Sequence, residues 1–112
     1  MSIKLAKSEI IHFIGIGGIG MSGLAVIMNS LGFKIQGSDI SKNKNIDRLK
    51  SNKIKIFLNH DKKNITNSTI IVVSSAIKNN NPELMEAKKR KLPIYKRGVM
   101  SVSYTHLRAH ET

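Results

Sequence analysis

The sequence predicts an α/β domain built on an open parallel sheet of about five strands, with helices on both faces. Apolar segments of strand length alternate along the chain with segments of helical period, and the connections are too long for hairpins. A glycine cluster directly follows the first apolar segment, residues 10–14. The run from Thr69 to Val73 consists only of β-branched residues, as expected of a central parallel strand covered on both faces. Together these features indicate a Rossmann-like arrangement.

The first half of the chain predicts two strands and two helices. After the strand at 10–14, apolar residues recur at helical spacing up to Leu31, and Gly32 is placed to end that helix. Residues 33–37 form the second predicted strand. Asn43 or Asn45 is expected to cap a short helix that buries Ile46 and Leu49.

The second half predicts three further strands and one helix. Ile54, Ile56 and Leu58 alternate as in a strand, and residues 69–73 form the next. Asn81, Pro82 and Glu83 are typical of an N-cap, a first-position proline and an acidic first turn. The helix that they open is expected to run to about Lys91. Its expected apolar positions are Leu84, Met85 and Ala87. Residues 93–95 form the last strand.

The glycine cluster has the spacing of a phosphate-binding turn. Gly15 would allow the tight turn, Gly17 would let a pyrophosphate lie against bare backbone, and Gly20 would let the helix pack close to its strand. The N-terminus of the following helix offers unpaired N–H groups and partial positive charge to an anion. A nucleotide diphosphate is the ligand favoured by this geometry, although a structural turn is the simpler alternative.

Polar residues follow the predicted strands at their carboxyl ends, where parallel sheets bind ligands. They are scattered in sequence but are expected to converge in space. These residues are Gly15 to Gly20, Ser38-Asp39, Asn59-His60, Ser74-Ser75 and Lys96-Arg97.

Length and composition limit the possible functions. The 112 residues suffice for one domain, and the absence of cysteine excludes disulfides, thiol nucleophiles and cysteine metal sites. No segment has the length and hydropathy of a membrane helix or a secretory signal, so a cytoplasmic location is expected. The net charge of +12 comes from lysines spread along the chain, with few aromatic residues for base stacking. We therefore expect neither nucleic-acid nor membrane binding.

Residues 101–112 differ from the rest of the chain because they contain no Lys, Ile or Asn. This stretch is similar to translated sequencing-adapter read-through. We expect a domain at 1–100 and a foreign, disordered tail at 101–112. His106 and His110 are accordingly not expected to bind metal, and no metal site is expected elsewhere.

Five motifs follow one another along the chain. They are His12 to Gly23, Gly37-Ser38-Asp39, Phe57-Leu58-Asn59-His60, Val72 to Ile77 and Asn81-Pro82-Glu83. In their order and spacing these motifs resemble the N-terminal domain of the Mur ligase family, in particular the branch that adds L-alanine to UDP-N-acetylmuramate. The resemblance covers about residues 8 to 100.

The resemblance implies a nucleotide-sugar-binding domain of an ATP-dependent, amide-forming ligase of peptidoglycan synthesis. Its ligand would be UDP-N-acetylmuramate. ATP and Mg²⁺ belong to a central domain with a Gly-Lys-Thr loop, which this sequence lacks, and a C-terminal domain follows. This chain alone is therefore expected to hold no cofactor, to contain no catalytic residue and to show no ligase turnover.

The resemblance also implies which residues bind the substrate. They are Gly15, Gly17, Gly18 and Gly20 for the pyrophosphate, Ser38 and Asp39 for the uridine end, and His60, Ser74 and Ser75. Each polar side chain has a structural alternative as a loop or strand-end group. Lys96 and Arg97 are expected to be solvated surface charges, and His12 is expected to be structural.

Two other functions remain open from the residues. A small NAD-binding regulatory or oxidoreductase domain is the main alternative, because Asp39 ends the second strand, where an acidic residue could bind a ribose. A basic RNA-binding module is the weaker alternative.

Overall fold

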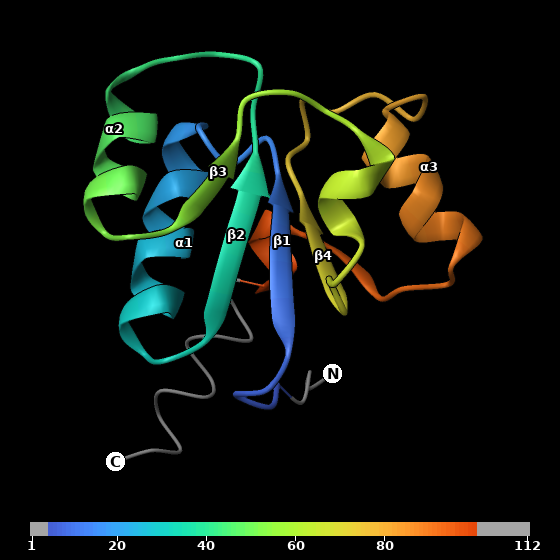
Figure 1. Ribbon diagram of the computed structural model, residues 1–112, viewed down its shortest axis with the longest axis horizontal. Helices are drawn as coiled ribbons and strands as arrows, with labels where there is room; N and C mark the ends of the chain where they lie inside the picture. The colour runs from blue at the N-terminus through green and yellow to red at the C-terminus, as the bar shows by residue number, and fades with distance from the viewer. Residues whose placement is uncertain (1–4, 101–112) are drawn as a thin grey trace.

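The computed structural model describes residues 5–100, and the predicted foreign tail at 101–112 lies outside them. Its five strands form one parallel sheet in the order β3-β2-β1-β4-β5, with helices on both faces, which confirms the predicted fold class (Figure 1). The elements are β1 (Ile10–Ile14), α1 (Ile19–Ser30), β2 (Lys34–Ser38), α2 (Lys44–Ser51), β3 (Lys55–Phe57), the 3-10 helix η1 (Lys62–Ile65), β4 (Ile70–Val73), α3 (Pro82–Lys89) and β5 (Ile94–Lys96). Residues 97–100 are helical.

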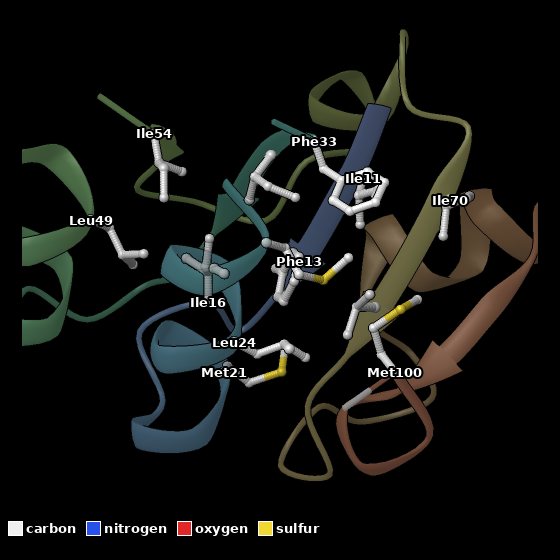
Figure 2. Close-up of a cluster of buried hydrophobic side chains, with 14 of the residues drawn as sticks. Ile11, Phe13, Ile16, Met21, Leu24, Phe33, Leu49, Ile54, Ile70 and Met100 are labelled. Atoms are coloured by element: carbon white, nitrogen blue, oxygen red, sulfur yellow. The ribbon is translucent and has the colours of Figure 1, made fainter. Parts of the chain in front are cut away.

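The sheet separates two hydrophobic cores because successive strand residues point to opposite faces. Ile11 and Phe13 of β1 pack with α1 and α2 in the larger core, which Figure 2 shows. Ile14 of the same strand joins Ile71 in the smaller core, against η1 and α3. All four residues of β4 are buried, as predicted for a central strand.

The local signals of the sequence place most element boundaries correctly. Asn43 caps α2 by accepting from the N–H of Ile46, and Asn81 caps α3. Gly32 follows α1 with a φ of +96°, in the left-handed region that favours glycine after a helix.

Three details of the elements differ from what the sequence predicted. The side chain of Met85 is 55% exposed rather than in the core, because it lies on the outer face of α3. That helix ends at Lys89, two residues before the predicted end. The 3-10 helix η1 was not predicted, since its four residues are too few to display a period.

Gly37 in the middle of β2 makes the turn after β1 possible. A Cβ atom at this position would lie 2.7 Å from the backbone oxygen of Phe13 and 2.7 Å from Cβ of Ile16. Only glycine therefore lets the fully buried Ile16 fold across β2. This close approach brings the glycine loop over the carboxyl end of the sheet.

Candidate functional site

The glycine loop, residues 15–20, is held in place by the end of β2. The N–H groups of Gly15 and Ile16 both donate to the carbonyl oxygen of Ser38, at 2.9 and 3.0 Å. Gly15 adopts a φ of +84°, which side-chain-bearing residues rarely adopt. The tight turn predicted at Gly15 is therefore present.

Gly17 is fixed by side chains on both of its backbone polar groups. Its N–H donates to Oδ2 of Asp39 at 2.8 Å, and its carbonyl accepts from Nδ2 of Asn45 at 2.9 Å. A Cβ atom here would lie 2.8 Å from the Asp39 carboxylate. Glycine is therefore needed at position 17 because Asp39 lies so close to it. The prediction was instead that glycine leaves bare backbone there for a pyrophosphate.

The N-terminus of α1 is open to an anion. Gly18 is its N-cap residue, no side chain caps it, and its first turn contains no acidic residue. The first helical hydrogen bond runs from the N–H of Ser22 to the oxygen of Gly18. The N–H groups of residues 19–21 therefore lack partners within the helix and carry its partial positive charge.

Two cations lie at the same helix end. Arg97 packs so closely on Gly20 that a Cβ atom there would be 2.8 Å from the arginine Cδ and Nε atoms. Lys96, Arg97, Ser74 and Ser75 line a cavity of about 540 Å³ together with the start of α1. Cations beside a helix N-terminus repel its dipole unless an anion lies between them. The predicted surface cations are exposed, yet they belong to this cavity.

A second cavity of about 240 Å³ adjoins the first, because Ser74 lines both. Its other polar walls are Asp39 and His60, with Gly15 and Gly18 at the loop. The predicted convergence of the strand ends is therefore present.

Of the predicted substrate-binding residues, Gly17 lines neither cavity, and neither does Ser38. Ser38 is fully buried, and its hydroxyl donates to Oε1 of Glu83 at 2.5 Å. Oγ of Ser38 also lies 3.0 Å from Nδ1 of His60. The side chain of Ser38 thus lies behind the cavities and contacts a residue that lines one of them.

Glu83 is the central group of a buried polar network that the sequence analysis did not identify. Its carboxylate accepts from Nε2 of His12 (2.7 Å), Nδ2 of Asn64 (2.7 Å) and the N–H of Asp61 (3.2 Å), as well as from Ser38. Both Glu83 and His12 are fully buried. The network confirms the structural role expected for His12, whose Nδ1 faces the amide nitrogen of Gln36 at 2.8 Å.

Two opposing effects act on the Glu83 carboxyl. Burial raises the pKa of Glu83, but the hydrogen bonds and charge of His12, with the hydrogen bonds of Ser38 and Asn64, outweigh burial and leave the pKa below its usual value. The group is therefore a carboxylate at neutral pH and can only accept hydrogen bonds.

The fold and the glycine loop define a Rossmann-like α/β domain whose ligand edge carries open backbone N–H groups and cations. Residues 10–101 match the family model described as "Mur ligase family, catalytic domain". The chain belongs to the Mur ligase family.

Similar proteins carry ligase names. The chain is 66% identical over 107 residues to the UDP-N-acetylmuramate–L-alanine ligase of Pelagibacter ubique, covering 96% of this chain and 23% of that protein. It is 55% identical over 100 residues to the ligase of the same name from Rickettsia felis, covering 89% of this chain and 21% of that one. The chain thus spans less than a quarter of the length of these curated relatives.

A solved structure has the same fold. The crystal structure of the UDP-N-acetylmuramate-alanine ligase from Thermotoga maritima matches with a TM-score of 0.80 and 33% identity, over 88% of this chain and 23% of that one.

Between residues 5 and 100, no group of three or more His, Asp or Glu side chains could hold a metal ion. No helix in this same range is long and apolar enough to cross a membrane.

Proposed function

We propose that this chain binds the UDP part of UDP-N-acetylmuramate, within a longer ATP-dependent ligase that joins L-alanine to that substrate in the cytoplasm during peptidoglycan synthesis. The observation that carries the proposal is the packing of Arg97 on Gly20 at the uncapped start of α1. The names of the relatives support the choice of substrate.

The two cavities divide the ligand between them. The larger, cationic cavity suits the pyrophosphate, which would accept from the N–H groups of residues 19–21 and from Arg97 and Lys96. The smaller cavity, with Asp39 and His60, suits the uridine. Asp39 would repel phosphate and so help to orient the ligand.

In the longer enzyme ATP and Mg²⁺ would supply the activation of the substrate carboxylate. The described residues offer no cluster of metal ligands, so we assign ATP and Mg²⁺ to other parts of that enzyme. The role of this chain would be to bind and orient the substrate. We accordingly expect the isolated chain to release no phosphate from ATP in the presence of L-alanine.

Calorimetric titration tests the proposal. The chain should bind UDP-N-acetylmuramate more tightly than NADH, and Arg97→Gln should raise the Kd for the nucleotide sugar about tenfold, because a charge-assisted hydrogen bond is lost. Arg48→Gln, on exposed α2, removes the same charge away from both cavities and should leave the Kd unchanged. Equal affinities of wild type and Arg97→Gln, or tighter binding of NADH, would contradict the proposal.

A further inference from the structure

The hydrogen bonds around Glu83 have only one consistent set of proton positions. All of its partners are donors, and the carboxylate has no proton to give. The single hydroxyl proton of Ser38 therefore points to Glu83, at 2.5 Å. The oxygen of Ser38 can then only accept from Nδ1 of His60, 3.0 Å away.

This direction of donation determines the form of the His60 ring. The ring proton must lie on Nδ1, which leaves Nε2 without a proton in the neutral ring. Because Nδ1 is directed to Ser38, Nε2 is the ring nitrogen that remains for the cavity lined by His60.

We propose that Glu83 and Ser38 are positioning residues that hold His60 as the Nδ1–H tautomer and present its Nε2 lone pair to the ligand cavity. The ligand role of His60 rests on the proposed function, whereas the tautomer does not. Glu83 lines neither cavity; it acts through the hydroxyl of Ser38 and through its own Oε2, which lies 3.6 Å from Nδ1 of His60 and favours a proton there.

The proposal defines the ligand chemistry at this position. A bare ring nitrogen accepts hydrogen bonds, so it binds a hydroxyl or an N–H group rather than a phosphate oxygen. A nucleoside carries such donors on its ribose and its base. His60 therefore selects for the nucleoside end of the ligand, while the cations at α1 receive the phosphates.

Direct observation of the tautomer is the first test. In ¹⁵N-labelled full chain at neutral pH, with resonances assigned through His60→Gln, His60 should show a protonated Nδ1 and a bare Nε2. Ser38→Ala removes the acceptor and should shift the ring towards the Nε2–H form that free histidine favours. The Glu83→Gln variant should reduce the Nδ1–H form, since an amide can donate to Ser38 and reverse its hydroxyl.

Glu86→Gln is the matched control, because it makes the same change on the same helix outside the network. Its His60 signals should match wild type. An Nε2–H tautomer in wild type, or an unchanged ring in Ser38→Ala, would overturn the proposal. Ser38→Ala keeps this test decisive even if Glu83→Gln fails to fold.

Titration with UDP tests the consequence for binding. Ser38→Ala should raise the Kd for UDP about three- to tenfold, the range of one hydrogen bond. In a His60→Ala background the same substitution should have no further effect, since Ser38 acts through the ring. If Ser38→Ala weakened UDP binding by the same factor in wild type and in the His60→Ala background, Ser38 would not act through the ring and the positioning role would be overturned. Failure of wild type to bind UDP would refute the proposed function, while the tautomer would still decide the present proposal.

Discussion

Replacing Glu83 by glutamine is expected to destabilise the domain by about 2–4 kcal/mol. The carboxylate accepts hydrogen bonds from three side chains and one backbone N–H; Glu83, His12 and Ser38 are fully buried, whereas Asn64 and Asp61 are partly buried. A glutamine side chain has one oxygen, so its NH₂ group must face at least one of these donors. An unsatisfied buried donor costs about 1–3 kcal/mol, and the bonds that remain lose the strengthening effect of the charge.

Urea unfolding followed by circular dichroism measures this loss. Small domains have unfolding free energies of about 5–15 kcal/mol, so the variant should still fold in the absence of urea. Glu86→Gln, one turn further along α3, should change the free energy by less than about 0.5 kcal/mol. If Glu83→Gln also stayed within that range, the network would contribute nothing to stability and our reasoning would fail.

The pH dependence of the difference in unfolding free energy between wild type and Glu83→Gln is a second measurement. The folded pKa of Glu83 lies below its ordinary value of 4.5. Its contribution to stability is therefore fully present above pH 4.5 and is lost as the pH falls through the folded pKa. The free-energy gap between wild type and Glu83→Gln should shrink on acidification below pH 4.5. A gap that widened there would contradict the lowered pKa.

Three glycine substitutions test the glycine loop and its surroundings. Gly37→Ala should destabilise by about 1–3 kcal/mol, because the new Cβ meets backbone at 2.7 Å, whereas Gly23→Ala, with nothing within 4 Å, should be neutral or stabilising in thermal unfolding. Gly17→Val should displace Asp39 and weaken binding of UDP-N-acetylmuramate at least tenfold, about 1.4 kcal/mol, with the fold checked by circular dichroism. An unchanged Kd in a folded Gly17→Val protein would mean that the loop is only a turn.

Features of the fold that depend on residues close together in the sequence were predictable. The caps at Asn43 and Asn81 and the left-handed Gly32 follow from local backbone chemistry, and the buried β4 follows from its β-branched run. The convergence of the strand ends followed from parallel topology. The sequence therefore predicts where in the fold these polar residues meet, while their role in binding stays a prediction.

Contacts between distant segments account for what was missed. Glu83 has the ordinary sequence context of an acidic first turn, but its partner His12 lies 71 positions away. Arg97 was predicted to be a solvated surface cation. Its contact with Gly20 depends on the pairing of β5 with β4, which brings residues far apart in the sequence together. No periodicity or motif encodes either contact.

The side-chain clamp on Gly17 has a thermodynamic consequence. Hydrogen bonds to Asp39 and from Asn45 hold this peptide within the fold itself, so the loss of its conformational entropy accompanies folding rather than binding. A ligand therefore meets a rigid receptor, and association should follow single-step kinetics without a slow rearrangement of the loop. If Asn45→Ala loosened this peptide, the entropy of ordering it would be lost on binding, and affinity would fall although Asn45 lines neither cavity.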